Sequence, residues 1–110
     1  MRPVKIRVPQ NLIEILEILS SMLVSAPRFL DKTGYFPYMN LEYAFQQLNQ
    51  GFSHNRLTLG EKRYADLMRM SDQMRALFEA DPEDKTGETL KGCKVIQEME
   101  EMLRQVQQES

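Results

Sequence analysis

The side chains that catalyse reactions or bind metals are few in this chain and widely separated. Among its 110 residues there is one histidine, His54, and one cysteine, Cys93. His54 stands in a polar stretch with no second acid–base group beside it, and Cys93 falls on an apolar helical stripe, where a thiol packs as a small hydrophobic side chain. The single cysteine cannot form an internal disulfide, and the two residues together cannot complete a zinc, iron or copper site. We therefore expect no metal and no cofactor.

Sequence motifs of catalysis are missing as well. The chain has no GxSxG, P-loop, HExxH, CxxC or GxGxxG motif. The carboxylates of Asp81, Glu83 and Asp84 are close enough in sequence to approach a calcium ion, but their spacing lacks the ligand positions and the central glycine of an EF-hand loop. Helix capping and surface charge account for these acids adequately. We expect a protein that is not an enzyme.

Length and composition fit a single domain that spans residues 1–110. The chain is 42% hydrophobic and 27% charged, and at this length folding buries roughly two-thirds of the unfolded surface, which is enough for one core. The longest apolar stretch, 12–24, is interrupted by Glu14 and Glu17, so it is too short and too charged for a membrane span or a signal-peptide core. We expect a chain that begins near Met1 and stays in the reducing cytosol.

The charge balance argues against binding to nucleic acid. The formal net charge is −2, with 14 Lys and Arg against 16 Asp and Glu. Binding to phosphates needs clustered Lys and Arg, and the sequence shows no such cluster. The excess of acidic residues falls in the last third of the chain, after residue 80.

Apolar side chains recur at helical spacing in four stretches of the chain. In the first stretch Ile13, Ile18 and Val24 widen the apolar stripe beyond a single face, which predicts that this helix is the most buried. In the last stretch the predicted buried stripe includes Leu90 and Cys93 and continues to Val106. The sequence therefore predicts an all-α fold, a compact bundle of about four helices with an extended N-terminal arm. The predicted helices span about 11–26, 40–51, 59–80 and 88–107.

Residues that cap helices mark where the predicted helices begin and end. Asn11 and Thr58 each precede a glutamate by three residues, which is the spacing of a capping box. Asn40 is suited to open the second helix, and Gly51 is a natural residue for its end.

The first ten residues form the predicted arm. Val4, Ile6 and Val8 alternate with Lys5 and Arg7, which is the period of an extended strand. No second stretch of similar character exists to pair with it. Three arrangements stay open: the arm packs on its own helices, pairs with another chain, or remains mobile.

The long connection between the first two predicted helices is unusually aromatic. Tyr35, Phe36 and Tyr38 lie within a few residues of one another, in a chain that is only 8% aromatic. One interpretation is a loop that covers one end of the core. The other is a set of anchors for a partner protein, because Tyr and Phe are enriched at the centres of interfaces.

Three segments between Tyr35 and Leu103 carry a family resemblance. They are 35–40 (YFPYMN), 56–60 (RLTLG) and 79–83 (EADPE). With these segments the chain resembles small all-helical immunity proteins, which protect bacteria from their own secreted polymorphic toxins. The resemblance covers about two-thirds of the chain and leaves the N-terminal arm outside it.

The resemblance implies a non-catalytic inhibitor that binds one-to-one to a cognate toxin domain delivered by a type VI or similar secretion system. Toxin domains that act on nucleic acids or nucleotides present basic clefts, and our hypothesis is that an acidic stripe of this chain enters such a cleft and excludes the substrate. The aromatic residues Tyr35, Phe36 and Tyr38 are the candidate anchors. The candidate acidic stripe consists of Asp81, Glu83, Asp84, Glu98, Glu100 and Glu101.

Two other functions stay open. One is a helical adaptor, a chaperone or a homodimeric assembly subunit that uses the N-terminal arm for strand pairing between chains. The other is a small helical transcription regulator, which requires a basic recognition helix. The predicted helix 59–80 carries Lys62, Arg63, Arg69 and Arg75, but its acids balance them.

Overall fold

The protein is all-α in the ranges that its computed structural model describes, which are residues 8–26, 40–81 and 83–109. The helices are α1 (Leu12–Ser25), α2 (Leu41–His54), α3 (Arg56–Leu59), α4 (Glu61–Ala80) and α5 (Glu88–Glu109). These ranges contain no strand, so the all-α part of the predicted fold class is confirmed there. Most of the predicted N-terminal arm and the aromatic segment that holds Tyr35, Phe36 and Tyr38 lie outside the described residues.

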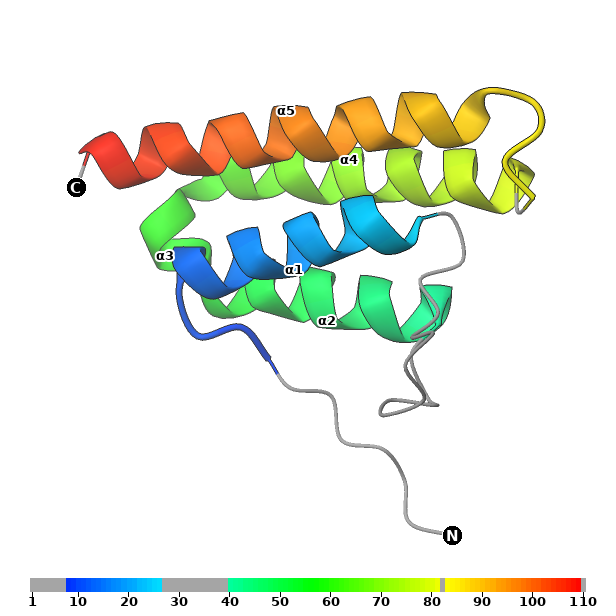
Figure 1. The fold of residues 1–110 in the computed structure, drawn as a ribbon. Helices are drawn as coiled ribbons and strands as arrows, with labels where there is room; N and C mark the ends of the chain where they lie inside the picture. The colour runs from blue at the N-terminus through cyan, green and yellow to red at the C-terminus, as the bar shows by residue number, and fades with distance from the viewer. Residues whose placement is uncertain (1–7, 27–39, 82, 110) are drawn as a thin grey trace, which may run out of the picture.

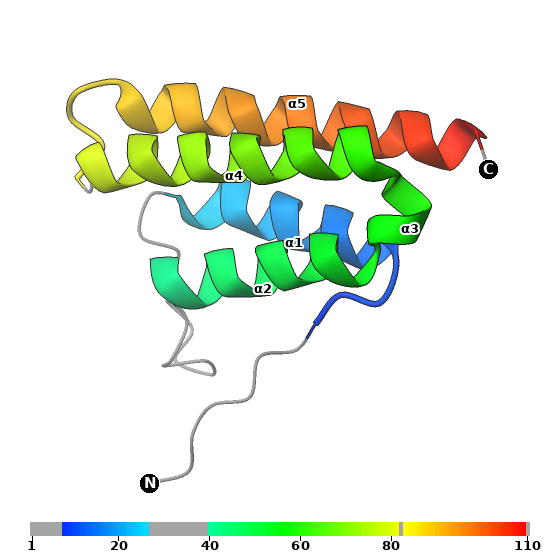
Figure 2. The ribbon, with the colours of Figure 1, turned by 180° about the vertical axis from the view of Figure 1, so that it is seen from behind.

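The four long helices pack side by side in a ring. Helix α1 contacts α2 and α5, and α4 contacts the same two helices. Figure 1 shows that consecutive long helices run in opposite directions, and the view from behind in Figure 2 agrees. Helix α3 forms a corner between α2 and α4, at the end of the molecule opposite the turn that joins α4 to α5.

The core lies between these helices and is built from aromatic and aliphatic side chains. The largest fully buried side chains are the rings of Phe45, Phe52 and Phe78. At about 25 cal/mol per Å² of apolar surface removed from water, burial of such rings is the main force that holds the helices together. Further buried aliphatic and methionine side chains of the core are Ile15, Leu19, Leu48, Leu59, Leu67, Met74, Ile96, Met99 and Leu103.

Asparagine caps fix the starts of the first two helices, as the sequence predicts. The Asn11 side chain accepts a hydrogen bond from the Glu14 backbone N–H at 2.9 Å, and the Glu14 carboxylate accepts one from the Gln10 N–H at 2.8 Å. Asn40 accepts from the Tyr43 N–H at 2.9 Å in the same way. Each cap satisfies a backbone donor that has no partner within the helix.

The predicted end of α2 at Gly51 is wrong. The helix continues through Gly51 to His54. Gly51 is buried because Pro9 packs against it, and a Cβ at this position would lie 2.8 Å from the proline Cγ. Glycine serves here to let the N-terminal segment approach the helix closely.

The predicted capping box at Thr58 is also wrong. Thr58 lies inside the short helix α3, and α4 begins only after Gly60, whose φ is 85°. An L-residue with a side chain rarely adopts that backbone conformation, so Gly60 sets the corner.

Two predictions about buried faces are corrected by the structure. Ile13 and Val24 are exposed, so α1 lies at the edge of the core and is not its most buried helix. In α5 Leu90 is exposed and Cys93 is half-buried, while Gly92 and Val95 take the inner positions. A step of three residues falls short of a full helical turn by about 60°. Steps of three residues back from Ile96 lead to Cys93 and then to Leu90, so the predicted stripe rotates away from the core.

Candidate interaction surface

The six acidic residues of the predicted stripe divide between two places. Asp81, Glu83 and Asp84 lie at the turn between α4 and α5, and Glu98, Glu100 and Glu101 lie within α5. The helix axis rises about 15 Å over the ten residues from 88 to 98. The two groups therefore do not form one continuous stripe.

Asp81 is not part of the surface, which corrects its assignment to the stripe. The residue is 2% exposed. Its Oδ1 accepts hydrogen bonds from the backbone N–H groups of Lys85 at 2.6 Å and Thr86 at 3.1 Å, and its Oδ2 accepts one from the Thr89 N–H at 3.1 Å. The Thr89 hydroxyl in turn donates to the Asp81 carbonyl at 3.0 Å. Asp81 thus joins the end of α4 to the first turn of α5.

These bonds keep the Asp81 carboxylate ionised. Burial alone raises the pKa of this group, but the backbone hydrogen bonds from Lys85, Thr89 and Thr86 lower it by more, so that the pKa falls from 3.8 to about 2. The N–H groups of Lys85 and Thr86 lie in the turn before α5, and the N–H of Thr89 lies in its first turn, where donors have no partner within the helix and a carboxylate is favoured.

Glu100 also turns inward, and its place in the predicted stripe is corrected as well. It is 6% exposed and lies where α5 meets α1. Its carboxylate accepts a hydrogen bond from the Ser20 hydroxyl at 3.3 Å and lies 3.6 Å from the Arg104 guanidinium. A buried carboxylate needs such partners to offset its lost hydration. The burial of Glu100 between helices makes it a structural residue.

The remaining four acids of the stripe are exposed. At the turn, Glu83 pairs with Lys85 at 2.9 Å, and Asp84 takes a positive φ of 56°, which aspartate tolerates better than most residues. Glu98 and Glu101 lie on the solvent side of α5. Neither of these two glutamates has an ion-pair partner among the described residues.

The arginines differ sharply from these glutamates, because every arginine in the described ranges already has an acidic partner. Most of the pairs lie on the surface, where each contributes little to stability. The pairs have a larger effect on the electrostatic field of the protein. Each pair cancels the positive charge of its arginine, and the acidic residues without a partner remain in excess. The pairs are Arg56 with Glu61, Arg63 with Glu109, Arg69 with Asp66, Arg75 with Glu42 and Glu79, and Arg104 with Glu100.

Exposed apolar side chains are a feature that the sequence analysis missed. Leu57 of α3 is 99% exposed, Val24 of α1 is 89% exposed, and Ile13 lies on the same helix as Val24. Single apolar side chains on a surface are common. The sequence of α1 did contain a sign of this exposure, because its apolar residues lie on more than one face. A helix at the edge of a core buries only one of these faces.

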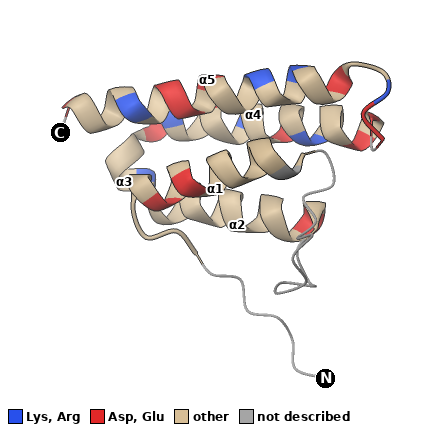
Figure 3. Cartoon of the chain, viewed as in Figure 1, with Lys and Arg blue, Asp and Glu red and all other residues tan. Residues whose placement is uncertain are grey.

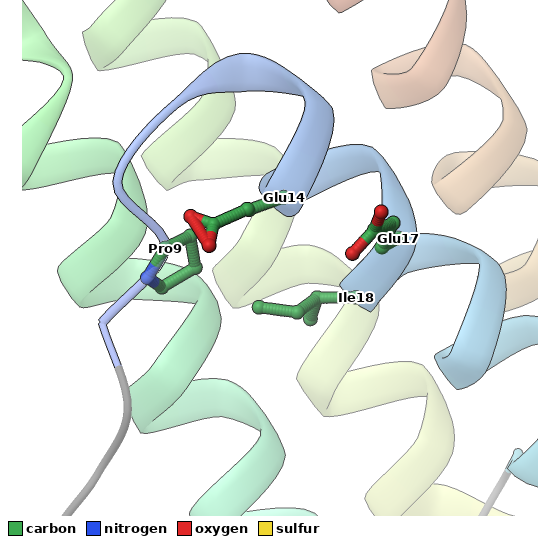
Figure 4. Close-up of a pocket in the computed structure, with 4 residues that line it drawn as sticks. All are labelled: Pro9, Glu14, Glu17 and Ile18. Atoms are coloured by element: carbon green, nitrogen blue, oxygen red, sulfur yellow. The ribbon is translucent and has the colours of Figure 1, made fainter.

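A small pocket opens beside the start of α1. Figure 4 shows its lining, which consists of Pro9, Glu14, Glu17 and Ile18, and its volume is about 120 Å³. In this close-up the Glu14 carboxylate points toward Pro9, where it also receives the Gln10 N–H. A typical site for an organic ligand is at least about 300 Å³ and mostly apolar. This pocket is too small and too open to the solvent for such a ligand.

His54 lies at the end of the molecule opposite the turn between α4 and α5, apart from Cys93. His54 is exposed at the end of α2, and Cys93 is half-buried in α5. Burial raises the pKa of the Cys93 thiol, and the nearby charge of Asp84 raises it further, which makes the reactive thiolate less abundant. Within residues 8–26, 40–81 and 83–109 no three His, Cys, Asp or Glu side chains gather as metal ligands would.

Comparison with known proteins gives no match. No family model, no curated protein and no solved structure matches the chain. A search of the described helices finds none that is both long and apolar enough to span a bilayer.

Proposed function

We propose that this chain is a cytoplasmic immunity protein that binds a cognate secreted antibacterial toxin one-to-one and neutralises it without chemistry of its own. The toxin would be one delivered by a type VI or similar secretion system. The proposed scaffold is the antiparallel bundle of about four helices with an extended N-terminal arm. The proposed mode of inhibition is occlusion of the toxin's active site, with Glu98 and Glu101 of α5 as the acidic contacts.

The observation that supports this proposal most is the unpaired state of Glu98 and Glu101. Both carboxylates are exposed on one side of α5, and neither has an ion-pair partner among the described residues. All arginines of those residues are already paired, so the chain does not neutralise this face with guanidinium groups. A positively charged surface is the partner that gains most from binding here.

Electrostatics of this kind suits an inhibitor that must capture a toxin quickly. Complementary charges steer two proteins together and raise the association rate, while buried apolar anchors slow dissociation. The acids on α5 supply the first effect. We assign the second effect to the aromatic segment with Tyr35, Phe36 and Tyr38, and we keep Glu83 and Asp84 as contacts at the rim.

A growth-rescue experiment tests the proposal. The tagged chain is purified from its native cells, and the toxin domain that accompanies it is expressed alone and together with the chain. Cells with the toxin alone are expected to stop growing, and cells with both are expected to grow. Failure of the wild-type chain to restore growth would contradict the proposal.

A matched pair of variants connects the rescue to Glu98 and Glu101. E98K/E101K reverses both acids on α5, whereas E17K/D72K changes the net charge equally through exposed acids on α1 and α4. We expect E98K/E101K to lose rescue and E17K/D72K to keep it. Equal rescue by both variants would remove α5 from the interface.

A further inference from the structure

The solvent side of α5 has a charge pattern of its own. Lys94, Glu98 and Glu101 are exposed and lie on the side of the helix opposite the buried Ile96 and Met99. Lys91 is exposed beside them, one turn before Lys94. The helix therefore carries two lysines in its N-terminal half and two glutamates one to two turns later. In Figure 3 the middle of α5 shows this order, blue residues followed by red ones, with a red residue before them at the start of the helix and a blue one after them.

These charges are little used within the chain. Lys94, Glu98 and Glu101 take part in no ion pair among the described residues, and Lys91 has only a 3.4 Å contact with Glu88. Lys94 and Glu98 are four residues apart, but a lysine that precedes a glutamate by four is the less favourable order for pairing along a helix. Both charges are thus available to another molecule.

The pattern is complementary to itself when the helix direction is reversed. In two antiparallel copies of α5 related by a two-fold axis at the level of Ile96, residue 94 of one copy lies opposite residue 98 of the other, and residue 91 lies opposite residue 101. Every lysine then faces a glutamate, and the contact repeats symmetrically, as a two-fold interface requires. A parallel pairing in register sets lysine against lysine and glutamate against glutamate, which is repulsive.

We propose that the free protein self-associates through this face, with α5 of one copy packed antiparallel on α5 of a second copy. Four ion pairs form across the two-fold axis, two between Lys94 and Glu98 and two between Lys91 and Glu101.

The self-association rests on α5 alone and not on the proposed function. If the protein both dimerises and binds a toxin through α5, the two interactions exclude each other, because the dimer covers Glu98 and Glu101. A toxin with a basic cleft then competes with the second copy, so the free inhibitor is a dimer and the toxin complex contains one copy of each chain.

Sedimentation equilibrium of the full chain with two opposite charge variants tests the dimer. K91E/K94E makes all four positions acidic, and E98K/E101K makes all four basic. We expect the wild-type chain to form a dimer that weakens as salt rises, and each variant alone to have a dissociation constant raised about tenfold or more by like-charge contacts. An equimolar mixture of the two variants should form a heterodimer, and the fourfold variant K91E/K94E/E98K/E101K should form a homodimer again.

Controls separate the interface from general effects of charge and from folding. K62E/K85E and E17K/D72K make the same changes in net charge at exposed positions outside this face, and they should dimerise as the wild-type chain does. Circular dichroism should show equal helix content in all variants. A wild-type chain that stays monomeric, or variants that all dimerise as well as wild type, would overturn the proposal. So would a dimer that is lost only on removal of residues 1–7, which would assign the contact to the N-terminal arm.

Discussion

Gly92 of α5 lies directly against the ring of Phe78 in α4. A Cβ built on Gly92 would lie 2.6 Å from the Phe78 Cε1 atom, closer than real Cβ atoms approach other atoms. Phe78 is fully buried, and its flat ring has little room to turn away. The missing side chain at position 92 thus lets α4 and α5 approach, and it fixes which side of α5 faces the core.

Replacement of Gly92 by alanine is expected to destabilise the protein. The added methyl group overpacks the contact, which costs about 1–3 kcal/mol, while alanine in a helix interior returns about 1 kcal/mol. We expect a net loss of about 1 kcal/mol in the free energy of unfolding, measured by urea denaturation. In the G92A/F78L double variant the smaller leucine relieves the clash. Its loss in the free energy of unfolding should therefore be smaller than the sum of the losses in G92A and in F78L. A G92A protein more stable than wild type would show that the helices move apart at no cost.

Acid is expected to unfold the protein partly through Asp81. The pKa of Asp81 is about 2 in the folded chain, against 3.8 without these contacts. Since the folded-state pKa is the lower one, this carboxylate stabilises the fold fully above pH 3.8 and loses its contribution as the pH falls toward 2. D81N should therefore lower the melting temperature near neutral pH and flatten its dependence on pH in that window.

An exposed aspartate in α4 provides the control for Asp81. D72N makes the same chemical change at a position with no ion pair among the described residues. Its melting curve should keep the acid dependence of wild type between pH 4 and 2. If D81N and D72N respond to acid alike, the backbone hydrogen bonds of Asp81 are not what holds the turn.

The contact between Pro9 and Gly51 predicts how the N-terminal segment is held. Besides this contact, the Asn55 side chain donates to the Pro9 carbonyl at 3.2 Å and to the Gly51 carbonyl at 2.8 Å. G51A should displace Pro9, because the new Cβ would lie 2.8 Å from the proline Cγ. We expect faster proteolysis within residues 1–10 and unchanged helix content. Equal proteolysis of G51A and wild type would mean that the segment is held elsewhere.

The helices could be predicted from sequence because their signals are local. Asn11 and Asn40 cap the helices that follow them, and apolar residues at helical spacing follow each cap. Gly51 and Thr58 misled the prediction because their roles depend on tertiary structure. Gly51 is helical where Pro9 packs on it, and Thr58 lies in a short helix that ends at Gly60.

The surface was harder to predict, because burial of a carboxylate depends on partners far away in the chain. Glu100 is held by Ser20, which lies 80 residues earlier. Asp81 is held by donors up to eight residues later, at the start of another helix. Neither partner leaves a local pattern, so Glu100 looked equivalent to its exposed neighbours Glu98 and Glu101.

A single charge reversal on α5 should slow binding to the partner. E98K and D72K change the net charge equally, but only Glu98 lies on the proposed face. At about 50 mM salt we expect E98K to lower the association rate about tenfold and D72K to change it little, with the difference fading near about 500 mM. Stopped-flow kinetics with the purified partner, at concentrations where the free chain is monomeric, measures both rates. Equal rates for the two variants would count against steering by α5.

The most direct test of the central claim is the recovery of the partner from native cells. The tagged chain is purified under gentle conditions, its companions are identified by mass spectrometry, and the mass of the complex is measured by light scattering. Our account predicts a secreted-toxin polypeptide in a one-to-one complex with the chain, released by E98K/E101K and retained by E17K/D72K. Recovery of the chain alone or only with copies of itself, under conditions where the toxin is expressed, would contradict the account.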